Sequence, residues 1–200
     1  ASVANAQQVF YTDFESGVPA EFSGAGAAEG TQGYASYGFG QQFLRNDTLG
    51  SPSILTLTNL PAHTAISIDL LLAAIDSWDS TNGSPSPDFF NISVDDVPVF
   101  QATFANTSGS NSYGPLLVDN ANLGFSGYLD DAADLTAIAA LTNIPHTASS
   151  VVIKFYASGG GWQGSTDESW AIDNLSVTAV PAPGAAAMGL LGLAALRRRR

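Results

Sequence analysis

Six carboxylates and all three tryptophans of the chain lie in two short segments rich in glycine and serine. The first segment, IDSWDSTNGSPSPDFF, covers residues 75–90, and the second, GGGWQGSTDESWAIDN, covers residues 159–174. Crowded carboxylates raise one another's pKa and destabilise a fold unless a cation neutralises them. Because the segments offer hard oxygen ligands and no His or Cys, they favour calcium over zinc or copper. The candidate ligands are Asp76, Asp79, Asp88, Asp167, Glu168 and Asp173.

An alternative interpretation is that these acidic loops are solvated and only keep the protein soluble, since Asp76-x-x-Asp79 does not have the spacing of an EF-hand loop. The tryptophans indicate a second chemistry, because aromatic rings on a β-sandwich stack on the apolar faces of sugar rings. Trp78 and Trp170 could instead seal an edge of the core. The candidate glycan-binding residues are Trp78, Trp162 and Trp170.

Paired carboxylates also allow an enzyme, an extracellular glycoside hydrolase or lyase that uses Asp79 and Glu168. Such a pair needs carboxyl groups about 5 to 10 Å apart in a cleft, one with a raised pKa, whereas calcium needs carboxylate oxygens that converge on one point. The sequence has no G-x-S-x-G motif and no cysteine nucleophile, and both histidines stand in proline turns, which favours a turn-capping role. We therefore predict a binding or structural module without catalytic residues.

The scaffold that positions these loops is predicted to be all-β, a jelly-roll β-sandwich over residues 7–179. Short alternating, β-branched and aromatic runs are separated by Gly, Pro, Asn, Asp and Ser. The segment 130–141, DDAADLTAIAAL, is open between helix and strand, and Gly24–Gly40 is predicted to be a long surface loop. The predicted strands are Val9–Phe14, Gln42–Arg45, Ser53–Thr58, Ala65–Ala73, Phe89–Val94, Val99–Phe104, Val151–Ala157 and Trp170–Thr178.

An internal repeat predicts which loops meet. LTNLPAHTAISIDLLLA, residues 57–73, and LTNIPHTASSVVIKFYA, residues 141–157, share an L-T-N-[LI]-P start, a His-Thr-Ala step and a following strand. If both strands begin at the same end of the sandwich, they also finish at the same end. Thirteen residues beyond His63 and His146 lie Asp76 and Gly159, where the two acidic loops begin. These loops are therefore expected to be neighbours.

Charge and composition narrow the classes of partner. All eighteen acidic residues precede Val180, where only Arg45 and Lys154 oppose them, and the other four basic residues are the last four of the chain. A body this acidic repels nucleic acid phosphates and anionic lipid, so we expect no nucleic acid partner. Because the chain has no cysteine, stability must come from the core or from bound metal rather than from disulfides.

Both ends of the chain indicate export. Ala4-Asn5-Ala6 has the small-x-small form that signal peptidase cuts after, so residues 1–6 are predicted to be the remnant of a signal peptide. Gly184–Leu196 is an uncharged stretch of thirteen residues. It is predicted to form a short hydrophobic helix of about 20 Å, less than the roughly 30 Å of a bilayer core. The arginines that follow would stay in the cytoplasm and leave the acidic body outside.

The last twenty-one residues, VPAPGAAAMGLLGLAALRRRR, resemble the PEP-CTERM sorting signal of bacteria. The resemblance implies that the helix anchors the chain transiently in the inner membrane, where an exosortase-type processing enzyme recognises the proline motif. The protein would then reach the cell surface or the extracellular matrix, with exopolysaccharide as a partner. Residues 180–200 are the sorting segment, and Ala182 stands where the family usually has Glu. The recognition residues would be Val180, Pro181, Ala182 and Pro183.

A second resemblance concerns the body of the protein. DFESG, residues 13–17, and WAIDNLSV, residues 170–177, resemble the first and last strands of jelly-roll modules of the galactose-binding and MAM-like type. That resemblance implies that Glu15 and Asp173 lie side by side and hold a structural calcium. The central segments are also similar to a family of PEP-CTERM surface proteins without an established activity, whose usual Gly is Ser80 here. The sequence thus predicts an exported, exosortase-sorted β-sandwich that is stabilised by calcium and binds glycan.

Overall fold

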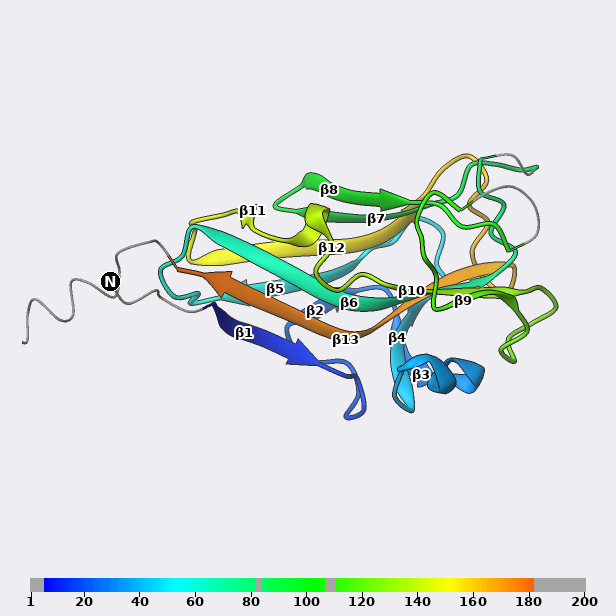
Figure 1. Ribbon diagram of the computed structural model, residues 1–200, viewed down its shortest axis with the longest axis horizontal. Coiled ribbons are helices and arrows are strands. Elements are labelled where there is room, and N and C mark those ends of the chain that lie inside the picture. Colours follow the sequence, from blue (N-terminus) through cyan, green and yellow to red (C-terminus); the bar gives the residue numbers. More distant parts are fainter. Residues whose placement is uncertain (1–5, 82–83, 107–110, 182–200) are drawn as a thin grey trace, which may run out of the picture.

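The computed structural model describes residues 6–81, 84–106 and 111–181, which form two antiparallel β-sheets packed face to face (Figure 1). The larger sheet has the strand order β3-β4-β13-β6-β10-β9, with β1 paired to β13 and β11 paired to β6. The smaller sheet has the order β2-β5-β12-β7-β8. The predicted jelly-roll β-sandwich is confirmed, whereas the predicted C-terminal helix falls within residues 182–200, outside the described part of the chain.

The two longest strands, β6 with 12 residues and β13 with 13, belong to the larger sheet. Its members are β1 (Gln7–Thr12), β3 (Ala27–Gly30), β4 (Gln42–Asn46), β6 (Ala65–Asp76), β9 (Val118–Ala121), β10 (Asp130–Asp134), β11 (Ile144–Pro145) and β13 (Glu168–Val180). The smaller sheet contains β2 (Phe22–Gly24), β5 (Ser53–Thr58), β7 (Phe89–Val94), β8 (Val97–Ala102) and β12 (Ser150–Ser158). The described residues also form two 3-10 helices, η1 (Gln32–Tyr37) and η2 (Ala139–Leu141). Among the described residues, no helix has the length and apolar character needed to cross a membrane.

The core between the sheets follows from the two-residue period of a strand. In β12, Val151, Ile153 and Phe155 point inward and are buried, while Lys154 and Tyr156 point outward. The central strands contribute aromatic and branched aliphatic side chains, which fill the space between the layers. The largest fully buried side chains of this core include Phe14, Trp78, Phe90, Phe104, Phe155 and Trp170.

The larger sheet is buried on its outer face as well. Tyr34 of η1 and Phe39 pack there with Phe43 of β4 and with Phe125, at ring centroid separations of 5.3 to 6.3 Å. The prediction that Gly24–Gly40 is a long surface loop is therefore wrong, because the segment forms β3 and η1 and buries Tyr34 and Phe39. Its glycines indicated a loop, but its aromatic residues gain more by covering the apolar outer face of the sheet.

The strand predictions agree with the structure where the sequence pattern is long enough to see. Each of the eight predicted strands overlaps an observed strand, with ends that differ by up to three residues. The ambiguous segment 130–141 divides into β10 followed by η2. The strands β2, β3, β9 and β11 were not predicted, because two to four residues are too few to show an alternation.

The internal repeat places the two acidic loops together, as predicted. His63 and His146 precede strands of different sheets, and their Nε2 and Nδ1 atoms lie 2.6 Å apart. β6 and β12 thus start at one end of the sandwich, and the loops that follow them meet at the other end (Figure 1). There, the backbone N–H of Gly161 donates to the carbonyl oxygen of Pro87 at 3.0 Å. This loop end holds the candidate site.

Candidate metal centre

Three carboxylates from separate parts of the chain converge at the loop end. Asp79 lies in the loop after β6, Asp88 directly precedes β7, and Glu168 is the first residue of β13. One oxygen from each carboxylate can be chosen so that all three lie within 4.8 Å of one another. Asp88 and Glu168 are fully buried, while Asp79 is half-buried and faces the surface. Such convergence on one point is what a calcium site requires.

The backbone satisfies only one oxygen of each buried carboxylate. The N–H of Asp79 donates to Oδ2 of Asp88 at 2.8 Å, and the N–H of Gln163 donates to Oε2 of Glu168 at 2.7 Å. The second oxygens, Oδ1 of Asp88 and Oε1 of Glu168, are buried and have no hydrogen-bond partner among the described residues. An unpaired buried polar atom costs roughly 1–3 kcal/mol, more if it is charged, so these two oxygens call for a cation or a proton.

Burial decides the charge state of this pair. Desolvation raises the pKa of Asp88 to about 6 and the pKa of Glu168 to about 8, and the charge of Asp167 adds to both rises. Backbone N–H donors oppose both shifts without cancelling them. Two ionised carboxylates are both acceptors, but a proton on Glu168 can be donated to Asp88, and that hydrogen bond lowers the pKa of Asp88. Without a cation, the pair therefore shares a proton at neutral pH.

A glycine run closes the site by direct contact rather than by flexibility. A Cβ on Gly161 would lie 2.4 Å from Oδ1 of Asp88, and a Cβ on Gly159 would lie 1.9 Å from the carbonyl oxygen of Pro87. Gly159 also has a φ of +123°, which a residue with a side chain rarely adopts. The GGG segment therefore allows the backbone to approach Asp88 more closely than any other residue type would permit.

A hollow lies beside the cluster and opens it to solvent on the side of Asp79. It has a volume of about 340 Å³ and is lined by Ser77, Asp79, Ser84, Pro85, Tyr128, Gln163 and Asp167. Calcium prefers about six to eight oxygen ligands, and water in this hollow would complete that coordination shell. Asp88 and Glu168, in contrast, are fully buried, so neither reaches a polymer substrate as a general acid or base would have to.

The structure separates the remaining predicted ligands from this cluster. Asp76, at the end of β6, accepts a hydrogen bond from the hydroxyl of Ser126 at 2.8 Å. Asp167 accepts one from the hydroxyl of Ser77 at 3.1 Å and lines the hollow without joining the three converging carboxylates. Both loops thus contribute ligands, but only part of their charge is concentrated on one point.

Glu15 and Asp173 meet at a different place, around Gly40. Asp173 is fully buried, and its carboxylate accepts the N–H of Gly40 at 2.8 Å, while Glu15 accepts the N–H of Gln42 at 3.1 Å. Burial raises the pKa of Asp173 to about 6, and the charge of Glu15 adds to the rise. Since Asp173 is five residues beyond Glu168 on β13, the two lie about 17 Å apart, too far to share an ion.

The tryptophans pack on the site instead of presenting open faces. Trp78 and Trp170 are 0% and 1% exposed, and the indole N–H of Trp78 donates to the carbonyl of Ser169 at 2.9 Å. Trp162 is half-buried, with its ring centroid 5.3 Å from that of Trp78 and its N–H on the carbonyl of Thr48 at 3.2 Å. In this structure, neither ring face of Trp78 or Trp170 is open to a sugar. Trp162 packs partly against the core.

Two further buried carboxylates, Asp130 and Asp131, were not among the site residues predicted from the sequence. Burial raises the pKa of both Asp130 and Asp131, on β10, to about 6. Asp130 accepts the N–H of Leu123 at 2.9 Å and so holds the loop between β9 and β10, while Asp131 accepts the N–H of Asn120 at 2.7 Å and so holds β9 itself. The paired acids within an apolar run were the available signal, but the undecided secondary structure of residues 130–141 obscured it.

No family model matches this chain, and no curated protein matches it. Solved structures resemble its fold. The xylan-binding CBM22-1 domain of Xyn10C from Paenibacillus barcinonensis is 13% identical, with a TM-score of 0.44 over 92% of this chain and 100% of that one. The K3 cleaved adhesin domain of Lys-gingipain from Porphyromonas gingivalis is 10% identical, with a TM-score of 0.46 over 87% and 99%.

A CBM61 module in complex with beta-1,4-galactotriose is 12% identical, with a TM-score of 0.40 over 82% of this chain and 92% of that one. Carbohydrate-binding modules with a β-sandwich fold are thus among the structural neighbours. At sequence identities of 10–13%, the similarity concerns the fold alone.

Proposed function

We propose that the protein is an exported β-sandwich binding module of the cell surface or extracellular matrix, whose loop end is stabilised by calcium and whose ligand is a glycan. The observation that supports the calcium site is that two fully buried carboxyl oxygens in one cluster, Oδ1 of Asp88 and Oε1 of Glu168, have no hydrogen-bond partner in the described part of the chain. Asp79 supplies a third carboxylate within 4.8 Å. A divalent cation would satisfy both oxygens and would replace the proton on Glu168.

The role of the ion in this proposal is structural. Asp79 and Asp88 belong to the loop after β6, while Glu168 begins β13, so an ion between them would tie the loops after β6 and β12 together. The chain has no cysteine with which to make that link covalently. An ion that binds only the folded state adds about 2.7 kcal/mol at 100 times its dissociation constant, which raises the melting midpoint by roughly 5–10 °C for this size.

The test is thermal unfolding of the full chain in EDTA, in millimolar calcium and in millimolar magnesium. We expect the largest rise with calcium, because three carboxylates and water suit a large and flexible coordination shell better than the strict octahedron of magnesium. The rise should disappear in Asp88→Asn and Glu168→Gln. Asp167→Asn and Asp173→Asn are matched controls, since both remove a carboxylate outside the cluster, and the rise should persist in both. Equal melting curves with and without calcium in the unaltered protein would exclude the site.

Export and sorting are the second part of the proposal, supported by the order of proline motif, apolar stretch and arginine cluster in residues 180–200. An exosortase-type enzyme would remove or exchange this tail at Val180–Pro183. The intact mass of protein isolated from the producing cells should then lack the apolar stretch and the arginines. Recovery of surface protein with Arg200 still attached would contradict processing.

A further inference from the structure

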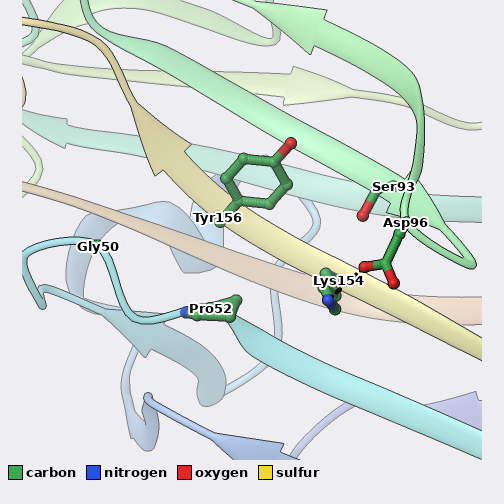
Figure 2. A pocket seen from close by; sticks show the side chains of 6 residues that line it. All are labelled: Gly50, Pro52, Ser93, Asp96, Lys154 and Tyr156. Carbon is green, nitrogen blue, oxygen red and sulfur yellow. Dashed lines mark hydrogen bonds and ion pairs between the residues drawn. The ribbon is translucent and has the colours of Figure 1, made fainter.

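We propose that the outer face of the smaller sheet carries a binding site for one neutral sugar ring. The site is a hollow of about 250 Å³ lined by Gly50, Pro52, Ser93, Asp96, Lys154 and Tyr156 (Figure 2). The inference rests on the proposed glycan-binding function, since it states where the module would hold its ligand. The hollow shares no lining residue with the calcium cluster or with the hollow beside that cluster.

Strand register brings these side chains together. Lys154 and Tyr156 are two residues apart on β12 and therefore share its outward face, and Ser93 of β7 is the direct partner of Lys154 in the ladder. Pro52 precedes β5, the neighbour of β12 on the other side. Figure 2 shows Pro52 and Gly50 on one side of β12 and Ser93 and Asp96 on the other, with Lys154 and Tyr156 on the strand between them.

The polar groups of the hollow match the hydroxyl groups of a sugar. Lys154 donates to Asp96 in an ion pair on the rim, so the site contains a cationic donor beside an anionic acceptor. Within the described residues, the hydroxyls of Ser93 and Tyr156 make no hydrogen bond. Each of them can donate and accept, as sugar hydroxyls also do. Neighbouring hydroxyls of a sugar can therefore engage donor and acceptor at the same time.

The apolar walls suit the carbon face of the same ring. Tyr156 offers a flat aromatic ring at the hollow and Pro52 a saturated pyrrolidine ring, and both residues are half-buried. An aromatic ring of this kind packs on the C–H face of a pyranose while its hydroxyl stays in water. The face is also held rigid beside Tyr156, because the amide of Asn91 donates to Ser158 Oγ at 2.9 Å and Gln101 donates to Asn91 at 2.8 Å. A platform fixed in this way loses little freedom when it binds.

Charge selects a neutral sugar over a charged one. Lys154 is one of only two basic residues before Val180, and it is already paired with Asp96. An acidic sugar would meet Asp96 and the field of a strongly acidic body, while a cationic ligand would meet Lys154. A neutral ring meets neither penalty.

The experiment is an NMR titration of the full chain in calcium, recording backbone amide shifts. The probes are the methyl pyranosides of glucose, galactose and xylose, each at tens of millimolar, because a single sugar ring binds in the millimolar range. We expect shifts at Lys154, Tyr156 and Ser93. Tyr156→Ala should weaken binding by about tenfold, since it removes the stacking ring, and Tyr156→Phe should weaken it less. Tyr128→Ala is the matched control, because Tyr128 is exposed and lines the other hollow.

The outcomes separate the site from the function. Shifts that gather at the hollow of Tyr128, and binding that falls with Tyr128→Ala, would overturn the proposed site while leaving a glycan-binding module. The absence of shifts with all three glycosides would overturn the site and the glycan ligand together. Calcium stabilisation of the fold is measured separately by melting and survives either result.

Discussion

Replacing Glu168 by Gln should make the calcium-free protein more resistant to alkaline pH. Burial raises the pKa of Glu168 to about 8 in the folded state, from its ordinary value of 4.5. Between these values the folded protein keeps a proton that the unfolded chain has lost, so stability falls as the pH rises through the folded pKa. From pH 6.5 to pH 9 the loss is about 2 kcal/mol for a folded pKa near 8. Gln has no proton to lose, and its amide can donate to Asp88 at any pH.

The assay is urea unfolding in EDTA at pH 6.5 and pH 9, for the unaltered protein and for Glu168→Gln. Asp88, Asp130, Asp131 and Asp173 have a pKa of about 6, so their titration is largely complete at the lower pH. Each protein gives a change in unfolding free energy between pH 6.5 and pH 9. The difference between these two changes therefore reports the titration of Glu168. Glu21→Gln, a change at an exposed glutamate, should behave as the unaltered protein does. Addition of calcium at pH 9 should restore the unaltered protein and leave Glu168→Gln unchanged.

A parallel loss of stability in the unaltered protein and in Glu168→Gln would refute the reasoning. It would mean that Glu168 is ionised or solvated in the folded state, so that its second oxygen needs no partner. The physical basis for a cation at this position would then be gone.

Three further predictions concern the same fold. Calcium binding at pH 7 should release close to one proton from the Glu168 carboxyl, measured by calorimetry in buffers of different ionisation enthalpy; binding heats that do not depend on the buffer would contradict this. Gly161→Ala should cost about 2–4 kcal/mol in urea unfolding and weaken calcium binding, because its Cβ would overlap Oδ1 of Asp88; an unchanged midpoint would show that the glycine run can move. His63→Ala should cost about 1–3 kcal/mol, since it leaves the buried Nδ1 of His146 and the carbonyl of Pro61 without their partner, and a cost near zero would show that water replaces the ring.

The two histidines show how far a sequence pattern can reach. Because the carbonyl of Pro61 can only accept, Nδ1 of His63 carries a proton, and in neutral His63 the Nε2 atom accepts from Nδ1 of His146. The repeat around them predicted which loops are neighbours, since equal spacing from a shared starting point is a local property of the chain. It contained no indication that the histidine rings themselves would touch.

Local pattern determined the strands and the class of fold. Alternation in SILTLT or SVVIKFYAS places one set of side chains on an apolar face, and only a second layer can bury that face. The equal spacing in the internal repeat likewise predicted that the two acidic loops would meet at one end of the sandwich. Short strands such as β3 and β11 were not predicted from the sequence, because their pairing depends on partner strands that are already in place.

Tertiary structure alone decided which carboxylates share a site. Asp79, Asp88 and Glu168 converge because β6 and β13 pair along their length, which returns the start of β13 to the end of β6. Asp173, on the same strand as Glu168, is carried to another part of the sheet. The same pairing buries Trp78 and Trp170 in the core, which was one of the two roles that the sequence left open for them. Burial and non-local register are properties of the assembled sheets, and no local stretch of sequence contains them.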